Sequence, residues 1–238
     1  MSKQAKVQNW LLWLTVVVFF NIEIYAAESL SIEQAQQQKD QKKYQAYIPE
    51  NFVLFEVVQG DLNKDAKNDL VLIVKATDPK AWVRDGYRGD LDRNRRGIIV
   101  LLNKNGKYQK ILQNLSAFSS ENEEGGVYFA PELVPSIEKG ILNLHYAHGR
   151  YGYWTYRFRL EGQDMRLIGY DDSSNHGPYV DTQTSINFLT HKKLDRENLN
   201  RDLDHDHANF KETWSRVNVT AIYLSKIKDF DTLDCSKW

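Results

Sequence analysis

Apolar and polar positions alternate with a period of two along much of the chain, which is the pattern of β-strands. The clearest case is Tyr153–Leu160. Its even-numbered residues, Trp154, Tyr156, Phe158 and Leu160, fall on one side of a strand, and Tyr153, Thr155, Arg157 and Arg159 fall on the other. The run Leu70–Val74 is apolar at every position, so we expect a strand that is covered on both faces.

Other short apolar segments, separated by turn residues, continue this pattern. They predict strands at Phe52–Gln59, Ile98–Leu102, Tyr108–Leu112, Ile141–Tyr146, Met165–Tyr170, Ser185–Leu189 and Val219–Leu224. Asn105-Gly106 predicts a tight hairpin turn, and Glu161–Asp164 predicts a second turn. Short strands that follow one another through turns indicate antiparallel sheets. The predicted fold is therefore mainly β, with a sandwich-like or partial propeller-like arrangement.

Three segments interrupt the extended pattern. Ser31–Gln45 is rich in straight-chain helix formers and lacks Gly and Pro, so a short N-terminal helix is expected within a lead-in of residues 28–46. Leu115–Gly126 is polar and ends in glycine, which predicts a loop where two sub-sheets meet, near residues 114–126. Asp195–Lys211 is highly charged and is expected to form an exposed loop or short helix. Residues 47–238 are predicted to form a single β-rich domain.

The first 27 residues have the layout of a secretory signal peptide. Lys3 and Lys6 precede the apolar run Trp10–Phe20, and the small residues Ala26 and Ala27 follow it. The apolar run has about 11 residues, fewer than the roughly 18 to 20 that span a bilayer. We therefore expect an exported protein, periplasmic or secreted, that is not stably inserted in a membrane after signal cleavage.

Charge and cysteine content narrow the function classes. The 31 Lys and Arg residues nearly balance the 32 Asp and Glu residues, which leaves a formal net charge of −1. This balance gives no electrostatic case for binding nucleic acid or an anionic membrane surface. Cys235 is the only cysteine, so no internal disulfide stabilises the fold. Near the terminus it either pairs with another chain or belongs to an inert or frayed tail.

The stretch GDLNKDAKNDLVLIV, Gly60–Val74, is the clearest indication of chemistry in the chain. Asp61, Asn63 and Asp65 occupy alternate positions, and Asp69 follows directly before the apolar strand. Calcium prefers six to eight oxygen ligands at about 2.3–2.6 Å. Such a site is predicted here, with oxygen ligands from the alternate side chains of this loop, from a backbone carbonyl near Lys67 and from the carboxylate of Asp69.

Two features limit this calcium hypothesis. The loop is not an EF-hand, because Ala66 and Leu72 occupy the positions that need glycine and glutamate. Lys64 and Lys67 offset part of the acidic charge, so the expected dissociation constant is weak, about 10⁻⁴ to 10⁻³ M, and the expected role is structural. The alternative is a polar hairpin connection whose Asp and Asn side chains form hydrogen bonds with nearby backbone.

The same stretch resembles the FG-GAP or VCBS type of repeat, whose pattern is G-D-x-N-x-D-G-x-x-D-hydrophobic. The matching residues are Gly60, Asp61, Asn63, Asp65, Asp69 and Leu70. The resemblance implies that the side chains of Asp61, Asn63, Asp65 and Asp69 hold calcium between two strands. Ala66 departs from the pattern, and if its backbone is left-handed it costs about 1–2 kcal/mol. Between Ile48 and Thr190 the chain is also similar to small exported bacterial proteins, a resemblance that implies no activity.

A second acidic loop begins with the same alternation, at Asp90, Asp92 and Asn94. Here Ile98 occupies the position where a fourth carboxylate would be needed. Three neighbouring arginines, Arg93, Arg95 and Arg96, would repel a cation. We expect an internal ion pair in place of a metal site.

Candidates for catalysis are few. His205 and His207 lie in an acidic run and offer the nitrogen and oxygen donors of a zinc-type site, so a metal-assisted hydrolase is one alternative function. The sequence contains no G-x-S-x-G elbow, P-loop or H-E-x-x-H motif, and its only cysteine is terminal. No catalytic residue is predicted.

The aromatic segment around residues 146–159 combines tyrosine and tryptophan with arginine, the residue types that are enriched at binding hot spots. Tyr153, Arg157 and Arg159 fall on the side opposite the predicted core and form a candidate surface for a protein or glycan partner. The sequence thus predicts an exported, non-enzymatic binding protein with a structural calcium loop. A periplasmic immunity-type inhibitor of a delivered toxin is the second alternative.

Overall fold

The computed structural model describes residues 34–123, 130–200, 208–233 and 235–238, so the predicted signal peptide lies outside the described residues. The chain divides into two compact units, residues 1–46 and 47–238. In the first unit, residues 34–44 form an α-helix, as the helix-forming composition predicts, and the 3₁₀ turn η1 (Gln45–Tyr47) follows it. Within the described ranges no helix is long and apolar enough to cross a membrane.

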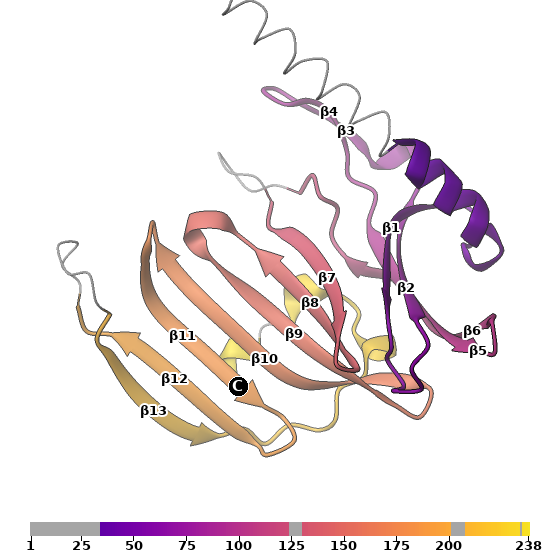
Figure 1. Cartoon of the computed structure of the whole chain (residues 1–238). Coiled ribbons are helices and arrows are strands. Elements are labelled where there is room, and N and C mark those ends of the chain that lie inside the picture. The colour runs from indigo at the N-terminus through magenta and orange to yellow at the C-terminus, as the bar shows by residue number, and fades with distance from the viewer. Residues whose placement is uncertain (1–33, 124–129, 201–207, 234) are drawn as a thin grey trace, which may run out of the picture. The chain divides into compact units, whose positions relative to one another are not determined.

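The first sheet has four antiparallel strands in the order β1-β2-β5-β6 (Figure 1). They are β1 (Phe52–Gly60), β2 (Asp69–Ala76), β5 (Arg96–Lys104) and β6 (Lys107–Phe118). The central strands β2 and β5 each bury seven consecutive residues, which agrees with the unbroken apolar run at Leu70–Val74. Asn105 and Gly106 have φ values of 54° and 86°, which suits the tight hairpin turn predicted between β5 and β6.

The second sheet has seven antiparallel strands that follow one another in chain order. They are β7 (Glu132–Glu138), β8 (Ile141–Ala147), β9 (Gly152–Glu161), β10 (Asp164–His176), β11 (Tyr179–Asn187), β12 (Lys192–Asn198) and β13 (Phe210–Arg216). A separate two-stranded hairpin, β3 (Trp82–Asp85) and β4 (Gly89–Asp92), comes between β2 and β5 in the chain and projects from the first sheet (Figure 1). The prediction of a mainly β, antiparallel fold is confirmed.

One hydrophobic core joins the two sheets and the C-terminal segment. Its fully buried members include Ile98 of β5, Leu142 of β8 and Phe158 of β9. The C-terminal segment contains three 3₁₀ turns, η4 (Leu224–Lys226), η5 (Phe230–Thr232) and η6 (Cys235–Lys237), and contributes Leu224 and Phe230 to this core. Since the segment is short and irregular, burial of its apolar side chains is what holds it in place.

Hydrogen bonds to the C-terminal segment and a close approach of two strands stabilise the packing of the sheets and this segment. The Tyr156 hydroxyl donates a hydrogen bond to the Leu233 carbonyl oxygen at 2.6 Å. The Asn114 side-chain amide donates to two carbonyl oxygens of the C-terminal segment, at 2.9 and 2.7 Å. At Gly60, a Cβ atom would lie 2.6 Å from Cβ of Ile137, so a glycine lets β1 approach β7 closely. The glycine that opens the acidic loop therefore also serves the contact between the two sheets.

Three predicted elements are wrong. Part of the charged segment predicted as a loop or helix forms the hairpin β12–β13, because backbone pairing on an exposed strand does not require apolar side chains. Val219–Leu224 forms no strand; apart from an isolated bridge between Arg166 and Tyr223, it contributes side chains to the core. Leu115–Phe118, predicted as loop, continues β6. The strands β3, β4 and β7 are not predicted by the apolar pattern.

Candidate functional site

The loop between β1 and β2 is held by hydrogen bonds from its own backbone to its polar side chains. The carboxylate of Asp61 accepts hydrogen bonds from the amides of Asp65 and Ala66, at 3.1 and 2.8 Å. The side-chain oxygen of Asn63 accepts from the amide of Asp65 at 3.0 Å, and Asp65 accepts from the amide of Lys67 at 3.0 Å. These contacts are those expected of the polar-turn alternative, and they gather the side-chain oxygens of alternate residues in one loop.

Asp69 connects this loop to the sheet. Its side chain is fully buried, one carboxylate oxygen accepts from the amide of Leu62 at 2.8 Å, and the other accepts from the amide of Asn103 at 2.8 Å. A carboxylate has about four lone-pair directions, so Asp61 and Asp69, with two backbone donors each, retain capacity for a cation. Among the described residues, no three His, Cys, Asp or Glu side chains are grouped so as to hold a metal ion, so the calcium site predicted at Asp61, Asn63, Asp65, Asp69 and a carbonyl near Lys67 stays a prediction.

The backbone of the loop is strained at two positions. Lys64 and Ala66 have φ values of 61° and 63°, in the left-handed region that favours glycine. Ala66 occupies the position where the FG-GAP and VCBS pattern has glycine. The loop therefore adopts at this residue the conformation that glycine would favour, and alanine costs about 1–2 kcal/mol there.

The outer side of the seven-stranded sheet contains the three residues predicted as a partner surface. In β9, Tyr156 and Phe158 are buried in the core, while Tyr153, Arg157 and Arg159 project from the opposite side. We call this side the open face. Its central residues, aligned across β8 to β11 by the strand register, are Asn143, His145, Tyr153, Thr155, Arg157, Asp171, Ser173 and Ser185.

Hydrogen bonds between neighbouring strands hold the polar side chains of the open face in place. The Ser185 hydroxyl donates to the Asp171 carboxylate at 2.6 Å, and the Arg157 guanidinium forms an ion pair with the same carboxylate. Farther along the row, His145 Nδ1 and the Thr155 hydroxyl lie 2.8 Å apart in a hydrogen bond. A row of polar groups across four strands is therefore fixed before any ligand arrives.

The aromatic and charged side chains of the open face remain accessible. Tyr153 is 37% exposed, and its ring centroid lies 5.4 Å from that of His145. The Arg157 side chain is 44% exposed although it pairs with Asp171. Arg159 lies only 4.0 Å from Glu161 and both side chains are exposed, so this ion pair contributes little to stability.

A pocket of about 400 Å³ opens at one end of the open face. It is lined by Ala130, Glu132, Ala147, His148, Gly149, Arg150 and Tyr151. Ala147 lies between Glu132 and Tyr153 in the strand register, so the pocket is continuous with the open face. The His148 and Tyr151 rings pack at 5.2 Å, and the Arg150 guanidinium lies 5.3 Å from the centre of the Tyr151 ring. The pocket therefore combines an aromatic wall with a carboxylate and a guanidinium.

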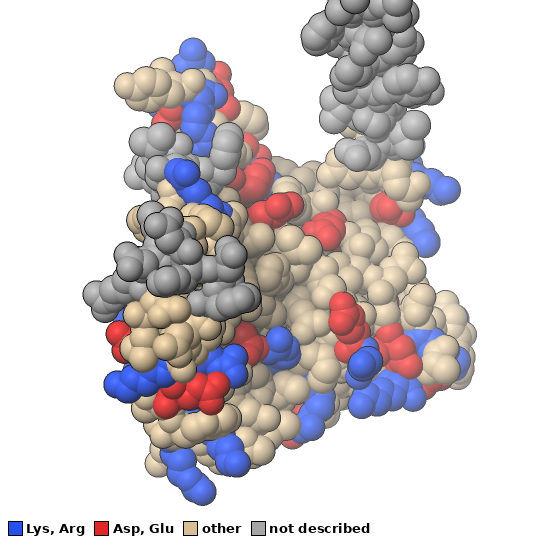
Figure 2. All heavy atoms as spheres, turned by 60° about the vertical axis from the view of Figure 1, so that its left-hand side comes forward, with Lys and Arg blue, Asp and Glu red and all other residues tan. Residues whose placement is uncertain are grey.

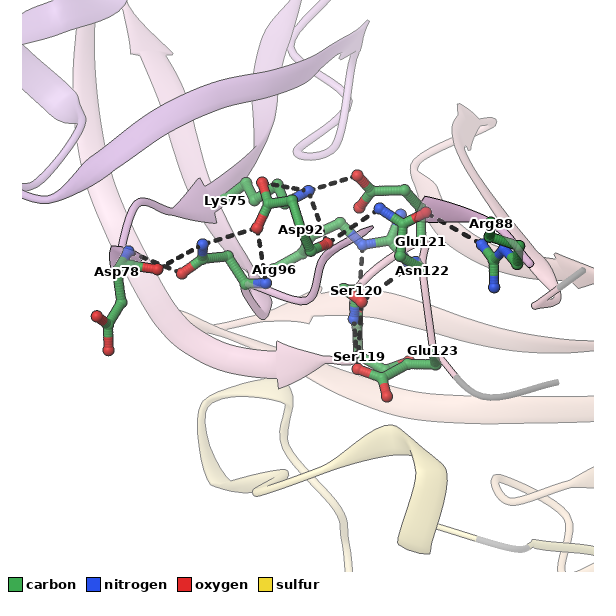
Figure 3. Close-up of polar contacts among 11 residues, drawn as sticks. Lys75, Asp78, Arg88, Asp92, Arg96, Ser119, Ser120, Glu121, Asn122 and Glu123 are labelled. Carbon is green, nitrogen blue, oxygen red and sulfur yellow. Dashed lines mark hydrogen bonds and ion pairs between the residues drawn. The ribbon is translucent and has the colours of Figure 1, made fainter. Parts of the chain in front are cut away.

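The second acidic loop forms the expected internal ion pairs, and Figure 3 shows the buried one. Lys75 of β2 is 6% exposed, and its ammonium group lies 2.9 Å from the Asp92 carboxylate and also pairs with Glu121. Asp90 pairs with Arg84 at 2.7 Å. Burial alone would raise the pKa of Asp92, but the hydrogen bonds from Lys75 and Asn94 outweigh it, so that pKa lies below its ordinary value. Of the neighbouring arginines, Arg95 pairs with Asp229 of the C-terminal segment at 3.0 Å.

Several titratable groups lie where the two sheets meet. Arg96 is 3% exposed, its Nε donates to the Ser119 carbonyl oxygen at 2.9 Å, and its guanidinium lies 5.1 Å from the centre of the Phe55 ring. Burial lowers the pKa of Arg96 and raises the pKa values of Glu56 and Tyr146. Burial is the largest cause of all three pKa shifts. We therefore interpret this cluster as part of the packing between the two sheets and not as a reactive site.

Charge is mixed over the surface. Figure 2 shows Lys and Arg side chains beside Asp and Glu side chains along the lower part of the drawn face, with no broad area of one sign among the coloured residues. This agrees with the near-neutral composition. A ligand that depends on a large field of one charge is therefore not favoured on this face.

Two predicted features at the end of the chain have different outcomes. His205 and His207 lie outside the described residues, so the zinc-type alternative stays a prediction. Cys235 is fully buried in the core, and the idea of a frayed tail is wrong. A disulfide with another chain would require the C-terminal segment to leave the core.

Comparisons of the chain with protein-family models, with curated proteins and with solved structures give no match. The resemblance to calcium-binding repeats, the export of the protein and its binding function therefore stay predictions.

Proposed function

We propose that the protein is an exported, non-enzymatic binding protein, and that the open face of its seven-stranded sheet binds a glycan chain. The observation that supports this proposal is the ordered row His145, Thr155, Asp171 and Ser185, whose side chains are held by hydrogen bonds across adjacent strands. Thr155 is only 7% exposed and orients its neighbour, whereas His145, Asp171 and Ser185 present donors and acceptors at fixed positions, so little conformational entropy is lost when a ligand binds.

The chemistry of the open face favours a hydroxyl-rich ligand over a protein. The cores of protein interfaces are more apolar than the surrounding surface. The centre of the open face consists instead of Ser, Thr, Asn, Asp, His and Arg side chains, with the ring of Tyr153 as an exposed platform. Sugar hydroxyls can both donate and accept hydrogen bonds, and the apolar side of a sugar ring can pack on an aromatic ring. The adjoining pocket offers a deeper position for one unit of the chain.

The calcium loop has a separate role in this proposal. Calcium bound by Asp61, Asn63, Asp65 and Asp69 would stabilise the connection between β1 and β2. Asp69 supports this role because its carboxylate already bridges the loop amide of Leu62 and the β5 amide of Asn103. The ion would hold the fold and supply no chemistry to the ligand.

Substitutions on the open face test the glycan proposal. Purified protein is assayed for binding to insoluble peptidoglycan, chitin and cellulose, and to soluble oligosaccharides of each by calorimetry. Tyr153→Ala and Arg157→Ala are each expected to weaken binding at least tenfold, which corresponds to about 1.4 kcal/mol. Trp82→Ala is the matched control, because Trp82 is also an exposed aromatic residue but lies on β3. Failure of every glycan to bind, or equal binding by all variants, would overturn the proposal.

A further inference from the structure

The hairpin formed by β3 and β4 presents exposed aromatic side chains away from both large sheets. We call residues 82–92 the arm. Tyr87, at its tip, is fully exposed, and Trp82, at its base, is 54% exposed. The two strands pair with each other as a separate sheet and project from the body of the protein (Figure 1). Neither aromatic side chain contributes to the hydrophobic core.

The tip of the arm is organised by its own contacts. One oxygen of the Asp85 carboxylate accepts hydrogen bonds from the amides of Tyr87 and Arg88, both at 2.8 Å. These hydrogen bonds lower the pKa of Asp85. Gly89 has a φ of 81°, which closes the turn, and Arg84 pairs with Asp90 across the two strands at 2.7 Å. The backbone that presents Tyr87 is therefore fixed without a partner.

The base of the arm is anchored to the first sheet by the polar network in Figure 3, in which Lys75 is the buried member. Asp92, the last residue of β4, pairs with Lys75 of β2, and its carbonyl oxygen accepts from the Asn122 side chain at 3.0 Å. The Asn122 side chain in turn accepts from Arg88 at 3.2 Å. On the inner side of the hairpin, Leu91 is 7% exposed. The network thus connects both the base and the tip of the arm to the body.

The opposite, outer side of the arm differs from the open face in chemistry. Trp82 and Arg84 are exposed there, Tyr87 is exposed at the tip, and these are the three residue types most enriched at protein binding hot spots. Tryptophan and tyrosine have few rotatable bonds, and the arm is already ordered, so little conformational entropy is lost when they become buried. Exposed aromatic residues on a rigid projection are typical of an interaction site.

We propose that the arm is a docking element for a folded protein partner with an apolar cleft. Tyr87 enters the cleft, Trp82 packs on its edge, and the Arg84–Asp90 pair meets a rim that contains both charge signs. The alternation of Arg84, Asp85, Arg88 and Asp90 around the aromatic residues supports a protein, because these charges match a mixed polar rim and oppose insertion into lipid chains. This site is independent of glycan binding on the open face.

Site-specific crosslinking in the producing cells identifies the partner. A photoreactive phenylalanine analogue replaces Tyr87 in one version of the full-length protein and Gln109, an exposed residue of β6, in a control version. The expected result is a protein crosslinked from position 87 and not from position 109. If no protein is specific to position 87, the proposal is overturned.

Binding measurements with the purified partner then test the arm directly. Tyr87→Ala and Trp82→Ala are each expected to raise the dissociation constant at least tenfold, whereas Tyr87→Phe changes it less than threefold and Tyr153→Ala leaves it unchanged. Because both aromatic side chains are exposed, the variants should melt at the temperature of the parent, which separates lost docking from lost folding. Unchanged affinity in both alanine variants would overturn the proposal. So would Tyr87-dependent binding to phosphatidylglycerol vesicles in place of the protein.

Discussion

Replacement of Ala66 by glycine should stabilise the protein, because the structure places this alanine in a left-handed conformation. Its φ is 63°, and the residue is exposed, so the substitution removes no core contact. The amide of Ala66 donates to Asp61 at 2.8 Å, and glycine keeps that donor. Only the backbone preference changes.

The magnitude follows from two opposing effects. Relief of the left-handed strain contributes about 1–2 kcal/mol. The greater freedom of glycine in the unfolded chain removes about 0.4–1 kcal/mol of that gain. The difference lies between about 0 and 1.6 kcal/mol, so we expect Ala66→Gly to raise the free energy of unfolding by about 0.8 kcal/mol, the middle of that range.

Urea unfolding in the presence of a calcium chelator measures this change without any contribution from the ion. The midpoint should rise while the slope stays constant, since the surface exposed on unfolding is the same. Ala221→Gly is the matched control, because Ala221 is exposed and does not have a positive φ. It should destabilise the protein by a few tenths to 1 kcal/mol. If Ala66→Gly also destabilises, the loop is not left-handed at residue 66 and the argument fails.

Three further outcomes are expected. Calcium should raise the melting temperature of the parent and a chelator should reverse the shift, whereas Asp65→Ala should abolish the response; an identical melt under all conditions would remove the calcium site. Asp92→Asn should cost about 1–3 kcal/mol at pH 7 in a urea titration. Because the folded-state pKa of Asp92 is below its unfolded value, its stabilisation is present above about pH 4 and is lost as pH falls through the folded-state pKa, so parent and variant should converge in acid. Gly152→Ala should destabilise by about 3 kcal/mol, since its Cβ would lie 1.7 Å from the Ser173 carbonyl oxygen at a φ of 114°; Gly162→Ala, where a Cβ meets nothing within 4 Å, should cost clearly less, and equal costs would contradict the close approach.

The sequence predicts those strands whose burial is visible in the pattern of apolar and polar side chains. Leu70–Val74 is apolar throughout because β2 is covered on both sides, and β9 alternates because only one of its sides meets the core. The hairpin β12–β13 escapes prediction because it is stabilised mainly by backbone pairing, which leaves little trace in side-chain polarity. Val219–Leu224 shows the opposite case, since an apolar segment can fill a core without joining a sheet.

The candidate sites are also predictable only in part: contacts within one loop can be predicted from the sequence, and contacts between distant segments cannot. The contacts among Asp61, Asn63 and Asp65 are predictable, because these residues are close in sequence and lie in one loop. The partner of Asp92 is not predictable in this way. Lys75 lies 17 positions away, while four arginines lie within four positions, and only the pairing of β2 with β5 brings the lysine close. The aromatic residues of the arm are missed because β3 and β4 have only four residues each.

The outer strands of the seven-stranded sheet limit how the protein associates with others. Within the described ranges, β7 and β13 lie at its two edges. β7 contains Pro135, which has no backbone N–H to offer to another strand. β13 contains Lys211, Glu212 and Arg216 and is exposed along nearly its whole length, so its charges oppose pairing with a neighbouring chain. Both edges of the sheet are thus poor templates for fibril growth, so copies of the protein can reach a high concentration while the broad side of the sheet stays available.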